Sequence, residues 1–212
     1  MSNGTVFKDI AERYDRLNAI LSLGQDQKWR RTVVSRLPGG RLLDLGAGTG
    51  AANPIFSPRE IIALDPAIEM LGFNDASARV VSVGEALPFR DETFDAVFSA
   101  YVFRNLDSVE TTMDEIARVL KPGGVAGIVD LGRPTGTVTS KVHRAGTSVV
   151  LPLAGMSIGA REEYVYLHHT LDKHPPPEEL LGDTPLDLVD TWRLGPMGFV
   201  WAALLRKAVL GT

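Results

Sequence analysis

The sequence predicts an α/β fold, a doubly wound and mostly parallel sheet that ends in an antiparallel C-terminal strand. Two observations predict it: short apolar runs alternate with segments of helical periodicity, and a glycine-rich turn follows the first run. Continuous apolar runs of this length are typical of strands that are covered on both faces. The expected strands are residues 41–45, 60–64, 79–83, 94–100 and 125–131.

Helical spacing of apolar residues predicts most of the remaining elements. Amphipathic helices are expected over residues 6–23 and 25–37, and a Pro-Gly-Gly segment ends the second of them. Another helix is expected to start near Asp107 and Ser108, with Asp107 and Glu110 as its capping pair. Residues 186–193 and 199–206 are expected to form a closing antiparallel pair.

The chain of 212 residues is expected to form one domain. We divide it into an N-terminal helical cap (1–38), a cofactor-binding half (39–132) and an acceptor-side half (133–212). The absence of cysteine excludes disulfides, thiolate catalysis and Cys-ligated metals. It also agrees with a cytoplasmic location. No metal site is expected. A net charge of −4 without a Lys/Arg-dense run argues against a nucleic-acid partner.

The first expected strand leads through Asp44 into a turn rich in glycine. The turn consists of Gly46, Ala47, Gly48, Thr49 and Gly50. Glycine permits positive φ and lets a ligand lie against the backbone. The helix that follows is expected to present free N–H groups to a carboxylate or phosphate.

Three interpretations of this turn compete. The first is a structural tight turn. The second is a dinucleotide site, although such a site prefers the spacing G-x-G-x-x-G. The third is an S-adenosylmethionine site in which Asp44 receives the ammonium group. Asp65 ends the second expected strand, where an acidic side chain binds ribose hydroxyls. The strand, the turn and the second acid together favour the third interpretation.

Residues after the other strands complete the expected cofactor site. Pro66 follows Asp65, and Glu85 with Ala86 follows the third strand, where such folds contact the adenine ring. An ordinary acidic loop explains Glu85 equally well. The fourth strand closes with residues expected to border the cofactor and the acceptor cavity, namely Ser99, Ala100 and Tyr101.

With these residues placed, the chain resembles the C-methyltransferases of ubiquinone and menaquinone biosynthesis over nearly its whole length. The resemblance is most specific in Arg13-Tyr14-Asp15 with residues 21–25, and in Arg104-Asn105. It also includes residues 7–18, 29–31, 44–50, 85–89, 103–106, 120–124, 164–167 and 175–180.

The resemblance implies a class I methyltransferase Rossmann-like fold and S-adenosylmethionine as the methyl donor, with S-adenosylhomocysteine as the product. It implies a demethylated polyprenyl quinol as the acceptor, and therefore peripheral contact with a membrane through an apolar entrance at residues 149–158. Carried over, the cofactor contacts are Thr49, Asp65, Glu85 with Ala86, and Ala100 or Ser99.

The chain departs from the family pattern behind the glycine turn. The family has a full helix there, whereas this chain has about ten residues that include Pro54 and Pro58. Proline inside a helix costs about 3 kcal/mol, so this helix is expected to be short or broken. The helix after Asp65 is expected to reach only about Asn74, and residues 136–160 match the family poorly.

C-methylation requires an electron-rich ring carbon, and a neighbouring hydroxyl makes that carbon nucleophilic when it loses its proton. Arg104 is the candidate that stabilises the resulting phenolate, and Asn105 the candidate that orients the ring. Tyr14 is expected to close the N-terminal helix over the cofactor, and His169 is a candidate general base. Structural roles compete with each: a loop ion pair, a turn residue, a buried helix contact and a surface or core histidine.

Three other functions remain open from the sequence. The first is a class I methyltransferase for another small molecule, which the poor match after Gly136 supports. The second is a protein that binds S-adenosylmethionine without catalysis, which the shortened helix after Gly50 supports. A nicotinamide-dependent enzyme is the third.

Overall fold

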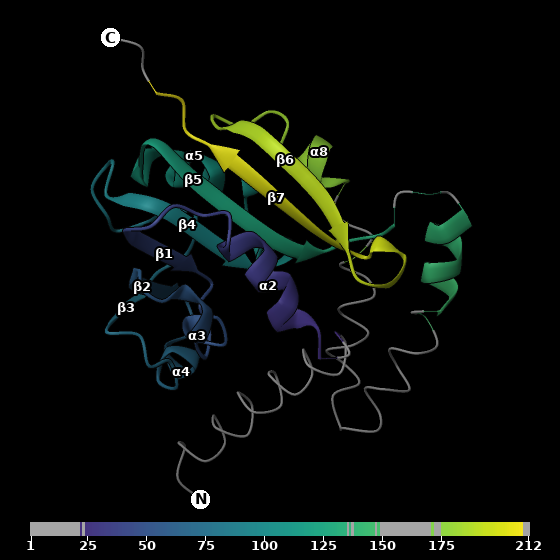
Figure 1. The fold of residues 1–212 in the computed structure, drawn as a ribbon, viewed down its shortest axis with the longest axis horizontal. Helices are drawn as coiled ribbons and strands as arrows, with labels where there is room; N and C mark the ends of the chain where they lie inside the picture. Colours follow the sequence, from purple (N-terminus) through teal and green to yellow (C-terminus); the bar gives the residue numbers. More distant parts are fainter. Residues whose placement is uncertain are drawn as a thin grey trace, which may run out of the picture.

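A seven-stranded sheet forms the centre of the computed structural model, which describes residues 22, 24–134, 136, 138–146, 148, 171 and 175–209 (Figure 1). The strand order is β3-β2-β1-β4-β5-β7-β6. Neighbours from β3 to β5 pair in parallel, and β7 runs antiparallel to both β5 and β6. The predicted α/β class, with its mostly parallel sheet and antiparallel C-terminal strand, is confirmed.

The strands follow the predicted apolar runs closely. They are β1 (Arg41–Leu45), β2 (Glu60–Asp65), β3 (Ala78–Val81), β4 (Phe94–Ala100), β5 (Leu120–Leu131), β6 (Asp187–Leu194) and β7 (Val200–Arg206). The largest difference is β5, which begins at Leu120 rather than near Val125. Leu120 pairs with Phe94 ahead of a register shift, so the strand includes an irregular segment before its apolar run.

Two helices cover opposite faces of the sheet. Helix α2 (Asp26–Val34) buries Trp29 and Val33 in one core cluster, and α5 (Val109–Val119) buries its apolar stripe in another. Alternate residues of β4 belong to the two clusters, Val97 to that of α5 and Phe98 to that of α2. Since successive strand residues point to opposite faces, the sheet lies between the helices.

The start of α5 differs from the predicted capping pair. Its N-cap is Ser108, whose side chain accepts a hydrogen bond from the Thr111 N–H at 3.1 Å. Glu110 therefore does not close a capping box with Asp107. Short elements elsewhere include η1 (Phe103–Asn105), α8 (Pro177–Leu180) and η2 (Pro196–Gly198).

The connections behind β1 and β2 contain only single helical turns, as their prolines and length predict. They are α3 (Asn53–Phe56), with Pro54 in its first turn, and α4 (Ile68–Leu71). Phe56 is fully buried and packs edge-on against Phe98. The Arg59 guanidinium donates to the carbonyls of Val34, Leu37 and Pro38 at 3.1, 2.7 and 2.8 Å, which satisfies the end of α2.

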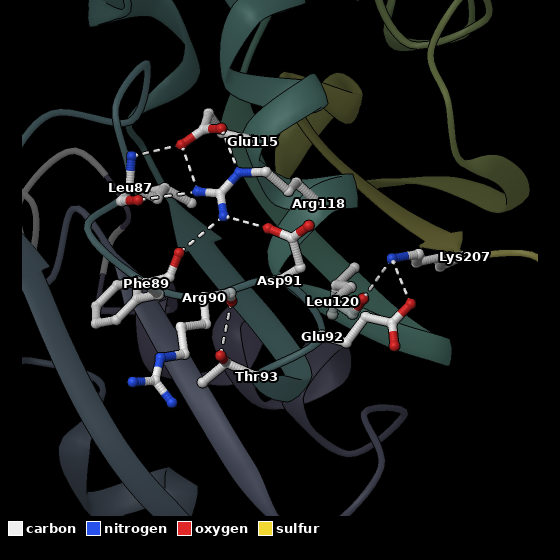
Figure 2. A network of polar contacts seen from close by, with 10 residues as sticks. All are labelled: Leu87, Phe89, Arg90, Asp91, Glu92, Thr93, Glu115, Arg118, Leu120 and Lys207. Atoms are coloured by element: carbon white, nitrogen blue, oxygen red, sulfur yellow. Dashed lines mark hydrogen bonds and ion pairs between the residues drawn. The ribbon is translucent and has the colours of Figure 1, made fainter.

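Arg118 on α5 fixes the loop between β3 and β4, as Figure 2 shows. Its guanidinium binds both carboxylate oxygens of Glu115 at 2.7 and 2.8 Å, and donates to the carbonyls of Leu87 and Phe89 and to Asp91. The hydrogen bonds from Arg118 hold the pKa of Glu115 below its usual range. Glu115 in turn accepts the Leu87 N–H at 2.7 Å, so one ion pair ties the whole loop to the helix.

We expect Arg118→Gln to lower the free energy of unfolding by about 1–3 kcal/mol, because a glutamine cannot replace a bidentate pair and leaves loop carbonyls unpaired. Urea unfolding followed by circular dichroism measures this. Arg90→Gln, which removes an exposed guanidinium from the same loop, is the matched control. Equal effects of the two substitutions would contradict the role given to Arg118.

Candidate functional site

A cavity of about 450 Å³ lies at the carboxyl ends of β1, β2 and β4. This is the position where open α/β sheets bind their ligands. The residues predicted from sequence that line it are Gly46, Ala47, Gly48, Thr49, Asp65, Pro66, Glu85, Ala100, Tyr101 and Asn105. Those that do not line it are Asp44, Gly50, Ala86, Ser99 and Arg104.

The glycine turn forms one wall and is attached to the end of β2. The N–H groups of Gly46 and Ala47 donate to the Leu64 carbonyl, and the Gly48 N–H donates to Asp65 Oδ2 at 2.9 Å. Gly46 has φ +74°, and a Cβ there would collide with the side chain of Val102. Glycine is therefore required at this point for both the backbone conformation and the space.

Asp65 has a backbone partner for each carboxylate oxygen. Besides the Gly48 N–H, the Ala67 N–H donates to Oδ1 at 2.8 Å. A carboxylate oxygen accepts more than one hydrogen bond, so Asp65 keeps accepting capacity on the cavity side. These contacts orient the carboxylate where the turn and β2 meet.

Asp44 lies beneath the turn and is almost fully buried. Its Oδ2 has no hydrogen-bond partner among the described residues. Burial raises the pKa of Asp44 from its ordinary 3.8 to about 7, nearby Arg30 lowers it in part, and Asp65 adds to the rise. Ser99 is also buried, and its hydroxyl has no partner within the described part of the chain.

Arg30 of α2 lines the cavity, and the sequence did not identify it as a site residue. Its guanidinium lies over the ring of Tyr101, 5.0 Å from the ring centroid. Tyr101 has φ +66°, a conformation that is rare for aromatic residues and that concentrates at functional sites. The available signal was the position of Arg30, directly after Trp29 and four residues after Asp26, on the buried side of an amphipathic helix.

Glu85 lines the cavity from the loop after β3. Its Oε1 accepts the N–H groups of Asp107 and Ser108 at 2.9 and 3.2 Å, so it joins the loop after β3 to the start of α5. Ala86 is exposed and does not line the cavity, and its carbonyl accepts the Ser82 hydroxyl. Of this pair, the structure brings only Glu85 to the cavity.

Arg104 and Asn105 occupy η1, after β4. Asn105 lines the cavity, whereas the Arg104 guanidinium donates to Asp130 Oδ1 at 3.0 Å and its side chain is 11% exposed. Asp130 also accepts the N–H groups of Phe103 and Leu131. Burial raises the pKa of Asp130, and Arg104 opposes that rise. Tyr14 and His169 lie outside the described residues.

The segment behind the glycine turn differs from one expectation. A helix with free N–H groups was expected to face a ligand, but α3 is a single turn whose first turn contains Pro54. None of its residues lines the cavity. The dipole of α3 is therefore not available to an anion at this site, since the effect requires a regular helix end.

Comparison with protein families settles the affiliation of the chain. The model of the ubiE/COQ5 methyltransferase family matches residues 2–184. The chain belongs to the ubiE/COQ5 methyltransferase family. This methyltransferase is 35% identical over 186 residues to the demethylmenaquinone methyltransferase of Streptomyces avermitilis, covering 83% of this chain and 80% of that protein. It is 37% identical over 192 residues to that of Thermus thermophilus, covering 82% and 87%.

Solved structures agree on the fold of this methyltransferase. A protein from Thermotoga maritima, described as a SAM-dependent methyltransferase and possible histamine N-methyltransferase, superposes with a TM-score of 0.65 at 19% identity. The match covers 96% of this chain and 98% of that one. At this identity the likeness concerns the class I methyltransferase fold alone.

The buried Asp44 carboxylate gives a prediction for stability. Its pKa is raised in the folded state, so the unfolded chain loses the proton first and folding becomes less favourable as pH rises from 3.8 toward about 7. The full difference corresponds to at most about 4 kcal/mol. Asp44→Asn removes this dependence, so we expect its unfolding free energy relative to wild type to increase by roughly 2–4 kcal/mol between pH 4 and pH 8.

Urea unfolding of both proteins in the absence of ligand measures the effect. Comparing them at each pH cancels the titration of all other carboxylates. A difference between the two proteins that stays constant from pH 4 to pH 8 would contradict the raised pKa.

Proposed function

We propose that this methyltransferase transfers a methyl group from S-adenosylmethionine to a ring carbon of a demethylated polyprenyl quinol of the demethylmenaquinol type. The products are the methylated quinol and S-adenosylhomocysteine. The single observation that carries the cofactor assignment is the pairing of Asp44, an unpartnered buried acid under the glycine turn, with Asp65 at the next strand end.

These residues fit an amino acid joined to a nucleoside. The unpartnered Asp44 Oδ2 is a suitable acceptor for an ammonium group, and Asp65 retains accepting capacity for ribose hydroxyls. Glu85 lines the part of the cavity where we place the adenine, with Leu106 and Val83 as apolar lining beside it. A dinucleotide fits less well, because a buried carboxylate repels a pyrophosphate.

The cofactor, when bound, supplies a methyl group that an electron-rich carbon displaces from sulfur. The protein orients the two reactants, and fixed geometry can lower such a barrier by about 7–11 kcal/mol. Asp44 and Asp65 fix the cofactor end of this alignment, while Tyr101 and Asn105 border the space next to it. The other polar residues proposed for the site act on the hydroxyl group of the acceptor.

On the acceptor side we propose that Arg104 stabilises the phenolate and that Asn105 orients the ring. Asp130 holds one N–H group of the guanidinium, and no other described residue accepts a hydrogen bond from Arg104. The guanidinium of Arg104 therefore has N–H donors left for an oxyanion. Tyr14, closing the site from the N-terminal segment, and His169, removing the hydroxyl proton, remain proposals that concern residues outside the described part of the chain.

The relatives support the proposed substrate class. Both curated relatives described above are named demethylmenaquinone methyltransferases, and they align over more than four fifths of this chain. A polyprenyl acceptor resides in a membrane, so we propose peripheral membrane contact through residues 149–158, which also lie outside the described part. No helix within the described residues is long and apolar enough to cross a membrane.

We expect the protein to add one methyl group to a short-chain demethylmenaquinol in the presence of S-adenosylmethionine and a reductant. Mass spectrometry of the extracted quinone measures it, and the unreduced quinone is the control, because its ring carbon lacks an activating hydroxyl.

We expect Arg104→Gln to reduce kcat roughly 100-fold, as does loss of an oxyanion donor elsewhere. Arg104→Lys, which keeps the charge beside Asp130, serves to separate that effect from a loss of folding.

Two outcomes would contradict the proposal. Transfer to other small molecules but not to the quinol would assign a different acceptor. Binding of S-adenosylhomocysteine without transfer to any acceptor would indicate a protein that binds the cofactor without catalysis.

A further inference from the structure

Arg30 presents a largely buried cation to the cavity. Its side chain is 9% exposed, and its Nε has no hydrogen-bond partner among the described residues. Among the described residues it forms an ion pair with Asp26, whose Oδ2 lies 3.8 Å from Nε, beyond hydrogen-bond distance. A guanidinium carries five donors, and burying any one of them without a partner is costly.

The surroundings hold this cation in place. The Tyr101 ring lies against the guanidinium, and α2 is fastened to the turn by Gln27, whose Nε2 donates to the Ala51 carbonyl at 2.8 Å. Ala51 and Arg30 both line the cavity. The orientation of Arg30 is therefore fixed before any ligand arrives, which reduces the entropy lost on binding.

Arg30 lines the cavity, and Asp44 is buried beneath the glycine turn that forms one wall of it. Arg30 is the neighbouring charge that opposes the rise in the pKa of Asp44. Among the described residues, Arg30 Nε and Asp44 Oδ2 both lack a hydrogen-bond partner, and the two groups together are complementary to an ammonium group and a carboxylate on one carbon atom. This is the amino-acid end of S-adenosylmethionine.

The described segment that follows the glycine turn offers no regular helix end to that carboxylate. The segment after the glycine turn, which was expected to offer free N–H groups, is the single turn of α3 with Pro54. We infer that Arg30 binds the cofactor's carboxylate and does for this chain what the helix end was expected to do. This inference rests on the proposed function, because it names the group that holds one part of that cofactor.

Calorimetric titration with two ligands tests the assignment. S-adenosylhomocysteine carries the carboxylate, whereas 5′-methylthioadenosine has the same nucleoside without the amino acid. We expect Arg30→Gln to weaken S-adenosylhomocysteine roughly 10- to 100-fold, as for a charge-assisted bidentate pair, and to change 5′-methylthioadenosine less than about 3-fold. Arg30→Lys retains the charge but not the fork, and we expect an intermediate loss.

Arg31→Gln is the matched control, since Arg31 is the exposed neighbour on the same helix, and we expect it to leave both affinities unchanged. Retained binding of 5′-methylthioadenosine shows that a variant is folded, and thermal unfolding of the ligand-free variants checks this independently. An equal loss for both ligands, or no loss for S-adenosylhomocysteine, overturns the inference while the proposed function stands. Failure of wild type to bind S-adenosylhomocysteine overturns the proposed function itself.

Discussion

The site depends on a buried carboxylate, that of Asp44, whose Oδ2 has no hydrogen-bond partner among the described residues. Asp44 lies near the carboxyl end of β1, where the neighbouring strands β2 and β4 exclude water. Burial of a charge without a partner is unfavourable, and the raised pKa of Asp44 expresses that cost. The rest of the sheet must supply the stability that compensates for it. Local instability of this kind is a common property of binding sites, since a ligand that completes the missing contacts relieves it.

The shortened connection behind the glycine turn changes how the ligand's opposite charge is met. A full helix would cover this face and offer its N-terminus to an anion, but two prolines leave room for only one turn. The chain covers the face with Phe56 and uses Arg59 to satisfy the end of α2. Helix α2, whose end Arg59 satisfies, places Arg30 at the cavity. A loss of one element near the site is thus balanced by a side chain from another.

How much the sequence predicts depends on the range of the interactions. The strands, the glycine turn and the acids at the strand ends are predictable, because apolar runs and strand-to-turn transitions are local patterns. The start of β5 at Leu120 was missed, because its pairing with Phe94 is a contact between distant segments. The N-cap was assigned one residue too early because Asp107 and Ser108 are both good caps, and only backbone geometry distinguishes them. Arg30 was missed as a site residue, since a cation beside Trp29 shows its role only when α2 packs over Tyr101.

If an ammonium group completes the contacts of Asp44, binding of the ligand must release the proton that Asp44 holds. Ligand-free Asp44 holds a proton below about pH 7, and an ammonium partner requires the ionised form. Calorimetric titration of wild type with S-adenosylhomocysteine in buffers of different ionisation enthalpy counts the protons released. We expect about one proton to be released per ligand at pH 6 and about none at pH 8.5, with no release from Asp44→Asn. Binding at pH 6 with a heat that does not depend on the buffer would contradict it.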